Sequence, residues 1–307
     1  MDYSFPHYLA AKKTIDDRAL NLRVWKTLEN ELELIQRTRP VTILEAGAGT
    51  GTMITRFLDK GVLFNGTYQA LDAVAENINA AGISLENWAD EHGWKKEPVS
   101  NGLNLYRDQN AVQINLQAID VFDFLEKRKP QQTWDCVIAN AFLDLFDSSQ
   151  IVHELGRCIK PGGLAYFTIN FDGVTEFEPV ANREFEERII GAYHRTMDDR
   201  MINNKHSGDS QAGRHLFQLF QREGFEILEA GSSDWVVYGR KGNYPADEAY
   251  FLHHMIHFFE ESLQNSPVLS SEELAAWTAG RHAQVERGEL VYIAHQMDFL
   301  ARAPKRR

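Results

Sequence analysis

Three glycines at alternate positions, Gly47, Gly49 and Gly51, follow a short apolar run over residues 41–46. An apolar run that ends in glycines predicts a buried strand and then a tight turn into a helix. Because glycine has no Cβ, a ligand can come close to the backbone of such a turn, and the N–H groups of the turn can face it. Glu45 adds a carboxylate at the end of the same strand. The segment therefore predicts a cofactor site where the first strand ends.

The spacing of these glycines distinguishes between two classes of cofactor. Dinucleotide-binding turns follow the pattern G-x-G-x-x-G, in which the third glycine comes three positions after the second. Position 52 is a threonine here, so the pattern is not met. The carboxylate of Glu45 would also repel a diphosphate at this strand end. The turn therefore argues against a nicotinamide or flavin dinucleotide.

Four further apolar segments predict strands, and two of them end in an acid. Asp72 ends the second strand and Asp120 the third, and a carboxylate at the end of the second strand can accept hydrogen bonds from both ribose hydroxyls of a nucleoside. The fourth segment is apolar throughout, as in a parallel strand buried on both faces. A helix over 151–159, stopped by the turn Lys160-Pro-Gly-Gly163, leads into the fifth. The predicted segments are 67–72, 112–121, 135–140 and 164–171.

The order of these motifs resembles that of the class I S-adenosylmethionine (SAM) methyltransferases, over roughly residues 41–172 and 225–300. The resemblance implies a Rossmann-like α/β fold, in which helices flank a seven-stranded, mostly parallel sheet with an antiparallel last strand. It implies SAM as the cofactor and a role for Asp120 in addressing the adenine amino group. The cofactor-binding residues that it implies are Glu45, Gly47, Ala48, Gly49, Gly51, Asp72, Asp120, Val121 and Asn140.

Helical segments surround the predicted sheet. Apolar residues at helical spacing predict one amphipathic helix over 14–38 with Thr14 as its N-cap, and Pro40 separates it from the first strand. In the resembled family such a helix often closes over the cofactor. The polar loop over 203–213 is either a mobile lid or an ordinary surface loop. We expect a helical cap over 1–40 and a SAM-binding domain over 41–307, with helical insertions at about 73–101, 180–223 and 246–287.

Composition narrows the range of partners. The chain of 307 residues has a net charge of −12 and no basic stripe of the kind that nucleic-acid-binding proteins carry, so nucleic acid is not expected as the substrate. No segment approaches the roughly 20 apolar residues that span a bilayer, so no membrane contact is expected. The first six residues lack the basic and apolar regions of a secretion signal. We therefore expect a cytoplasmic enzyme with a small-molecule substrate, and a homodimer is the candidate assembly.

Cysteine and histidine positions give little sign of a metal site. The two cysteines, Cys136 and Cys158, fall in a predicted strand and a predicted helix, where we expect buried thiols rather than a disulfide. His253 and His257 are four residues apart on a predicted helix, a spacing that can bind a metal. No third ligand stands at a suitable spacing, so no metal is predicted.

Candidate substrate residues follow from the position of ligands in open α/β sheets, outside the carboxyl ends of the strands. Residues after strands four to six and in the helical additions combine aromatic rings with isolated charges of both signs. This set suits a small zwitterionic metabolite, with an arginine for a carboxylate, carboxylates for an ammonium and aromatic faces for a cation. The candidates are Tyr8, Arg18, Trp25, Asp144, Phe171, Asp172, Arg214, Asp234 and Trp235.

The catalytic residues stay unassigned, because no histidine or tyrosine stands out as a general base. A missing base fits a nucleophile without a proton, such as a thioether. In its length, N-terminal helix and elaborated end, the chain also resembles bacterial enzymes that S-methylate methionine on the way to dimethylsulfoniopropionate. Methylation of an amino acid, with methionine first, is therefore the leading hypothesis. The alternatives are an O- or N-methyltransferase of a natural product with a tyrosine base or a histidine base (His194, His206 or His215) and a non-catalytic SAM-binding partner subunit.

Overall fold

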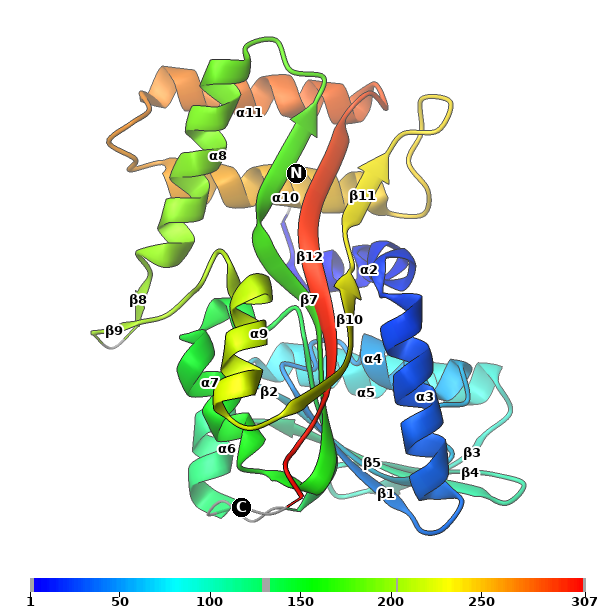
Figure 1. Cartoon of the computed structure of the whole chain (residues 1–307). Helices are drawn as coiled ribbons and strands as arrows, with labels where there is room; N and C mark the ends of the chain where they lie inside the picture. Colours follow the sequence, from blue (N-terminus) through cyan, green and yellow to red (C-terminus); the bar gives the residue numbers. More distant parts are fainter. Residues whose placement is uncertain (1–2, 129–132, 203, 306–307) are drawn as a thin grey trace.

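A ten-stranded mixed sheet forms the centre of the computed structural model, which describes residues 3–128, 133–202 and 204–305 (Figure 1). The strands of this sheet are β1 (Val41–Ala46), β2 (Asn65–Asp72), β3 (Lys95–Val99), β4 (Gly102–Arg107), β5 (Asn110–Ala118), β6 (Trp134–Asn140), β7 (Ile159–Glu178), β10 (Glu226–Ser232), β11 (Trp235–Tyr238) and β12 (Val291–Arg302). They follow the order β10-β12-β7-β6-β1-β2-β5-β4-β3, and β11 pairs with β12 beside this path. A separate ribbon joins β8 (Met201–Ile202) to β9 (Lys205–His206).

The five middle strands, from β7 to β5, run parallel. Toward both edges each strand is antiparallel to its inner neighbour: β12 to β7 and β10 to β12 on one side, and β4 to β5 and β3 to β4 on the other. β6 is buried at every position but its last, as expected for a parallel strand with helices on both faces. The predicted mostly parallel sheet with an antiparallel last strand is confirmed. The sheet exceeds the predicted seven strands because β3 and β4 extend one edge and β11 adds to β12.

Helices cover both faces of this parallel region (Figure 1). The helices of the described residues as a whole are α1 (Phe5–Ala11), α2 (Lys13–Ala19), α3 (Leu22–Gln36), α4 (Thr52–Asp59), α5 (Ala75–Glu91), α6 (Val121–Arg128), α7 (Ser148–Gly156), α8 (Arg183–Asp198), α9 (Ala212–Arg222), α10 (Glu248–Leu263) and α11 (Ser271–Glu286), with a 3₁₀ turn η1 (Leu143–Leu145). On one face α3, α4 and α5 enclose a core that contains Leu28 and Phe57. On the other face α6, α7 and α9 enclose a core that contains Ile151 and Phe220.

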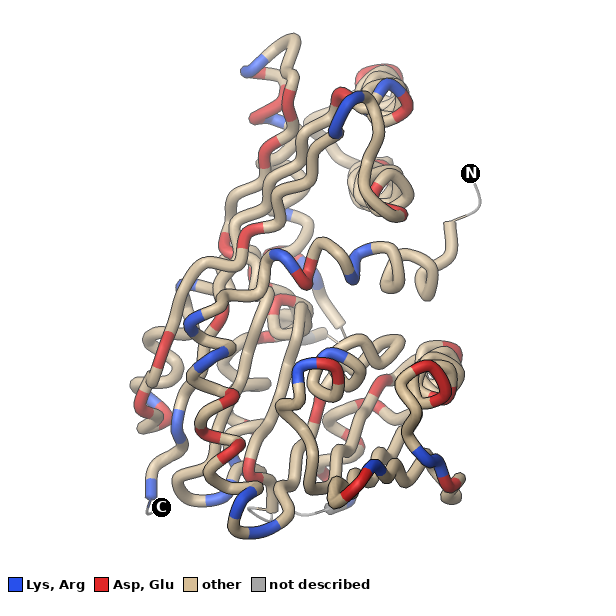
Figure 2. The backbone as a smooth tube through the Cα atoms, turned by 90° about the vertical axis from the view of Figure 1, so that its right-hand side faces the viewer, with Lys and Arg blue, Asp and Glu red and all other residues tan. Residues whose placement is uncertain are grey.

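β7 and β12 continue beyond these helical layers and carry a third core (Figures 1 and 2). Their far ends pack against α8, α10 and α11, and the ring of Phe177 contacts the rings of Phe259, Trp277 and Tyr292. The fifth strand was predicted to end at residue 171 and continues to Glu178, because this core buries alternate residues of the extension. We call this part of the molecule the upper lobe.

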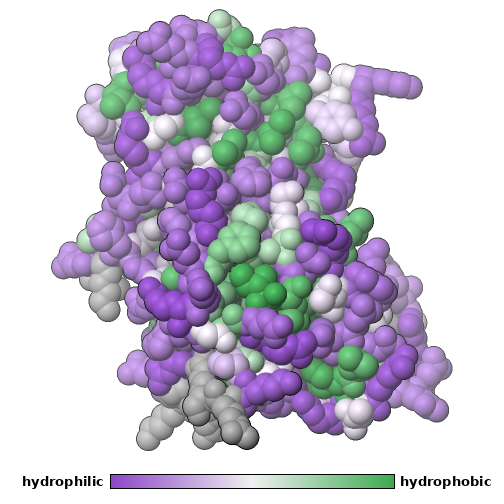
Figure 3. Space-filling view, viewed as in Figure 1, coloured by the Kyte–Doolittle hydropathy of each residue, from purple (hydrophilic) through white to green (hydrophobic). Residues whose placement is uncertain are grey.

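The opposite face of the upper lobe carries exposed apolar side chains. Val174 of β7 is 41% exposed and Val236 of β11 is 43% exposed. Figure 3 shows hydrophobic residues on this side of the molecule, surrounded by hydrophilic ones. Within the described ranges, no helix combines the length and the apolar character that crossing a bilayer requires.

The N-terminal segment forms three helices, so the single helix predicted over 14–38 is wrong. Apolar spacing continues across Leu20, but the backbone leaves the helix there, with φ −47° and ψ 126°. Asn21, not Thr14, caps the following helix by accepting hydrogen bonds from two N–H groups of its first turn. The carboxylate of Asp298 fixes this break by accepting the N–H of Asn21 at 2.7 Å. As a result α3 packs on the sheet, and only α1 and α2 lie between the sheet and the upper lobe (Figure 2).

Candidate active site

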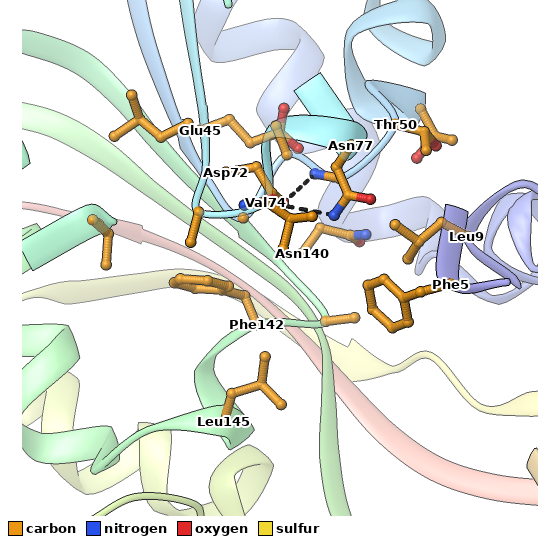
Figure 4. A pocket seen from close by; sticks show the side chains of 18 of the residues that line it. Phe5, Leu9, Glu45, Thr50, Asp72, Val74, Asn77, Asn140, Phe142 and Leu145 are labelled. Atoms are coloured by element: carbon orange, nitrogen blue, oxygen red, sulfur yellow. Dashed lines mark hydrogen bonds between the residues drawn. The ribbon is translucent and has the colours of Figure 1, made fainter. Parts of the chain in front are cut away.

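The glycine turn after β1 forms one wall of a cavity of about 270 Å³ at the carboxyl ends of β1, β2, β5 and β6 (Figure 4). We call it the glycine-turn cavity. Gly47, Gly49 and Gly51 have φ angles of 70°, 53° and 77°, which residues with a Cβ rarely adopt. A Cβ on Gly47 would lie 2.2 Å from Cδ2 of Phe142. Gly51 does not line the cavity, because it caps α4 and packs against Ala81. Gly47 and Gly49 therefore form the ligand-facing part of the turn.

The carboxylate of Asp72, at the end of β2, holds the glycine turn in place. Its Oδ2 accepts a hydrogen bond from the N–H of Gly49 at 2.9 Å. Its Oδ1 accepts hydrogen bonds from the N–H of Val74 at 2.9 Å and from Nδ2 of Asn77 at 3.1 Å (Figure 4). A carboxylate has about four lone-pair sites, so one remains free. Asp72 also lines the cavity and can accept a hydrogen bond from a ligand hydroxyl.

Glu45 is a buried acid that also lines this cavity, with only 2% of its surface exposed. The hydroxyl of Tyr68 donates a hydrogen bond to its Oε2 at 2.8 Å. Burial raises the pKa of Glu45 to about 7, and the bond from Tyr68 and the charge of Arg56 act against a further rise. The carboxyl group is therefore near its titration midpoint at neutral pH. A cationic group bound beside it would favour the ionised form.

The remaining predicted cofactor residues complete the same cavity. Asp120 caps α6, since its Oδ1 accepts the N–H of Phe122 at 2.8 Å. Asn140 ends β6, and its Oδ1 accepts a hydrogen bond from the hydroxyl of Thr168 at 2.8 Å. Ala48 and Val121 are buried beside them. The structure thus brings eight of the nine predicted cofactor residues to one cavity, all except Gly51.

Two residues of α1, Phe5 and Leu9, close the glycine-turn cavity on its other side together with Lys12, which follows the helix (Figure 4). Leu9 approaches the turn so closely that its Cδ1 lies 3.1 Å from the position of a Cβ on Gly49. Phe5 and Lys12 line the cavity with it. Sequence reasoning missed all three, as well as Asn77, because no local pattern connects α1 with the glycine turn. Only the packing of α1 between the sheet and the upper lobe brings them together.

A second cavity of about 230 Å³ adjoins the first. The two share the wall residues Phe5, Leu9, Lys12, Ala141 and Leu145. Beyond this shared wall the second cavity, which we call the aromatic cavity, is lined by the rings of Tyr8, Phe171, Tyr193, Trp235, Phe258 and Tyr292. A molecule in the aromatic cavity is therefore next to a molecule in the glycine-turn cavity.

Two residues in the walls of the aromatic cavity have left-handed backbone. Ala141 has a φ of 50° and Ile169 a φ of 56°, which for a β-branched residue such as Ile169 is a genuine outlier. The N–H of Ile169 donates a hydrogen bond to Oδ1 of Asp298 at 2.7 Å, which holds the strained backbone in place. Such strain costs about 1–3 kcal/mol per residue and clusters at functional sites. Its position here supports the assignment of the cavity as part of the active site.

Polar side chains of the aromatic cavity lack partners within the described protein. Oδ1 of Asp144 and Oε1 of Gln296 are buried and make no hydrogen bond. Burial raises the pKa of Asp144 to about 6, while the charges of Lys12 and Arg200 act to lower it. An unsatisfied buried polar group costs about 1–3 kcal/mol. The cavity is therefore suited to a polar ligand that meets these groups.

Four of the predicted substrate residues, Tyr8, Asp144, Phe171 and Trp235, line the aromatic cavity. The other five line neither cavity, which corrects the prediction for Arg18, Trp25, Asp172, Arg214 and Asp234. Each has a structural partner instead. The partners are Glu248 for Arg18, the rings of Phe57 and Tyr166 for Trp25, each other for Asp172 and Arg214, and His295 for Asp234. A charge or an aromatic ring in the right segment does not specify which way the side chain packs.

The three histidines considered as bases line neither cavity. His194 lies behind Thr175, which lines the aromatic cavity, and its Nε2 is 3.1 Å from Oγ1 of Thr175. Burial lowers the pKa of His194. His206 and His215 line a separate cavity between α7 and α9. The lid interpretation of the 203–213 loop stays a prediction, and residue 203 lies outside the described residues.

Cys136 and Cys158 are both buried and neither forms a disulfide, as predicted. Nδ1 of His253 lies 2.8 Å from Nδ1 of His282 rather than pairing with His257. Among the described residues, no group of three or more metal-ligating side chains is close enough to hold an ion.

Residues 17–230 match the sequence profile of a family described as methyltransferase domain. The chain belongs to this family. The match covers more than half of the sequence and contains the glycine turn, Asp72, Asp120 and Asn140. Together with the fold and the glycine-turn cavity, it identifies the chain as a SAM-dependent methyltransferase with SAM as its cofactor. No match was found among curated proteins.

Solved structures similar to this chain are distant in sequence. A SAM-dependent methyltransferase from Thiobacillus denitrificans, solved with S-adenosylhomocysteine (SAH), is 13% identical, with 99% of this chain and 100% of that chain covered and a TM-score of 0.45. A SAM-dependent methyltransferase from Geobacter sulfurreducens, also with SAH, is 12% identical, with 92% of each chain covered and a TM-score of 0.40. A mycolic acid cyclopropane synthase is 11% identical, with 86% and 79% covered and a TM-score of 0.41. At these values the similarity gives no information on the acceptor.

The residues of the glycine-turn cavity fit SAM. The missing Cβ of Gly47 makes room for the ring of Phe142, which lines the cavity. Asp72 would accept a hydrogen bond from a ribose hydroxyl of bound SAM, and Glu45 would offer a carboxylate to its α-ammonium group. Bound SAM supplies a sulfonium methyl group that is open to in-line displacement. The task of the protein is then to hold the nucleophile beside that group in the adjoining cavity. Such positioning can lower a barrier by roughly 7–11 kcal/mol.

Proposed function

We propose that the protein methylates a small zwitterionic acceptor, an amino acid, bound in the aromatic cavity, with the thioether of methionine as the first candidate nucleophile. The observation that carries this proposal is that the cavity contains charges of both signs. Asp144 lines it together with Lys12 and Arg200, and the rest of the wall consists mainly of aromatic and aliphatic side chains. Free amino acids carry the complementary pair of charges.

The size of the aromatic cavity supports a small acceptor. Its volume of about 230 Å³ lies below the roughly 300–1,000 Å³ of pockets that hold drug-sized ligands. A large natural product would have to extend beyond it. Figure 2 shows Lys and Arg interspersed with Asp and Glu rather than gathered on one face of this view, an arrangement that does not favour a nucleic-acid acceptor.

The chemistry of the walls supports recognition of both ends of an amino acid. The free Oδ1 of Asp144 can accept a hydrogen bond from an ammonium group, and a bond to a charged group contributes about 1.5–3 kcal/mol. The guanidinium of Arg200 can bind a carboxylate in a bidentate manner. Met197 and Met255 line the cavity with the aromatic rings and offer an apolar place for a side chain such as that of methionine.

A thioether nucleophile agrees with the absence of a strong base from these walls. No histidine lines the described part of the aromatic cavity, and burial raises the pKa of Tyr193 to about 12, which makes this tyrosine a poor base at neutral pH. Asp144 favours one second candidate, N-methylation of the amino group. In that reaction its carboxylate would take the proton that the nitrogen loses.

The test is methyl transfer from radiolabelled SAM to single amino acids, with the products identified by mass spectrometry. We expect label on methionine sulfur and an Asp144→Asn variant whose KM for the amino acid rises about 10- to 100-fold, while its affinity for SAH stays within twofold. Label found only on uncharged phenols or alcohols would contradict the proposal. An unchanged KM in the variant would remove the role of Asp144.

A further inference from the structure

Lys12 stands at the boundary between the two cavities. It connects α1 to α2, lines both cavities and is only 7% exposed. No other lysine or arginine appears among the described residues that line the glycine-turn cavity. A buried cation at this place is costly unless it meets an anion.

The partners of Lys12 within the protein leave part of its binding capacity unused. Its Nζ lies 3.4 Å from Oδ2 of Asp16 and 5.2 Å from the centre of the Trp235 ring. Trp235 itself donates a hydrogen bond to Oδ1 of Asp16 at 2.9 Å, so Asp16 is held in position. The ammonium group has three N–H donors, and none makes a hydrogen bond of acceptable geometry to a described residue. A ligand can therefore complete its coordination.

A comparison of the charged groups of SAM with the residues of the cavity indicates which of these groups Lys12 can bind. Glu45 offers a carboxylate to the α-ammonium group, and Asp72 and Asp120 face groups that donate hydrogen bonds. Among the described residues that line the glycine-turn cavity, Lys12 is the one cationic partner for the α-carboxylate of SAM. In the aromatic cavity, Arg200 is available for the carboxylate of an acceptor.

We propose that the ammonium group of Lys12 binds the α-carboxylate of SAM and SAH. Lys12 thereby sets the position of the amino-acid end of the cofactor at the boundary between the cavities. Because the same side chain lines the aromatic cavity, cofactor binding also fixes part of the acceptor's wall. The proposal rests on SAM as the cofactor and not on the class of acceptor.

The test compares two ligands by calorimetry on the full chain. SAH carries the α-carboxylate, whereas 5′-methylthioadenosine keeps the nucleoside and the thioether without the amino-acid part. We expect Lys12→Met to weaken SAH binding about 10- to 100-fold and to leave 5′-methylthioadenosine within twofold. Lys13→Met is the matched control, because Lys13 pairs with Asp17 outside both cavities, and it should change neither affinity.

Two results would overturn the proposal. SAH affinity that is unchanged in Lys12→Met would show that Lys12 does not bind the carboxylate, and an equal loss for both ligands would show that it only shapes the cavity. If Lys12→Met does not fold, the wild-type protein decides the question with SAH and its α-carboxamide analogue. The carboxamide should bind at least about tenfold more weakly, and equal affinities would refute the proposal. No acceptor enters these measurements, so a wrong acceptor class would not alter them.

Discussion

A methyl group added to the glycine turn should disturb both the fold and the cofactor site. In Gly47→Ala the new Cβ would lie 2.2 Å from Cδ2 and 2.7 Å from Cε2 of Phe142. Carbon atoms pack at about 3.5–4.0 Å, so the ring or the turn must move by more than about 1 Å. The left-handed φ of 70° adds roughly 1–2 kcal/mol for a residue with a Cβ, and repacking adds about 1–3 kcal/mol. We expect Gly47→Ala to lose roughly 2–5 kcal/mol of unfolding free energy.

Gly61 provides a control that separates these two contributions. Its φ of 66° is close to that of Gly47, but a Cβ there would meet nothing within 4 Å. Gly61→Ala should therefore lose only roughly 1–2 kcal/mol. Urea unfolding measures the free energies, and calorimetry with SAH measures the site. Gly47→Ala should bind SAH more than about tenfold more weakly because Phe142 lines the cavity, whereas Gly61→Ala should bind it as the wild type does.

If both variants lose the same unfolding free energy and Gly47→Ala keeps its SAH affinity, the turn accommodates a Cβ without cost. Close approach of the Phe142 ring would then not be the reason for glycine at position 47.

Three further predictions concern acidic residues. Burial raises the pKa of Glu45 from 4.5 to about 7. The protonated carboxyl group therefore contributes fully to the free energy of unfolding below pH 4.5, and this contribution is lost as the pH rises through 7. Urea unfolding at pH 5 and pH 8 should show a loss of up to about 3 kcal/mol in the wild type that is missing in Glu45→Gln. Burial acts to raise the pKa of Asp135, but hydrogen bonds from Arg39, Thr42 and Lys160 lower it from 3.8 to about 2. The free energy of unfolding should therefore fall by about 2 kcal/mol as the pH drops from 4 to below 2. An equally steep fall in Asp135→Asn would contradict this. Because the pKa of Asp144 is about 6, kcat/KM for methionine should rise through pH 6 and then stay level, whereas a rise that continues toward pH 9 would indicate an amine nucleophile.

The sequence by itself determined the cofactor site and the sheet around it. The residues of that site lie at the ends of predicted strands, and each strand is a local apolar run that ends at a glycine, an acid or an asparagine. In a parallel sheet such strand ends meet along one edge, so a local pattern is enough to bring Glu45, Asp72, Asp120 and Asn140 to one cavity. Long-range packing was not needed to predict it.

Only the tertiary structure decided what faces that site. Helical spacing indicates that Trp25 lies on the apolar face of its helix, but it does not say against which element this face packs. In the structure Trp25 packs against the core, whereas Trp235 lines the aromatic cavity. The break at Leu20 separates α2, and α1 before it, from α3, and the long β7–β12 pair carries the upper lobe against which α1 and α2 pack. Lys12 and Arg200 reach the aromatic cavity through these contacts between segments far apart in the chain. Such contacts depend on which surfaces exclude water together, and no local pattern of residues contains that information.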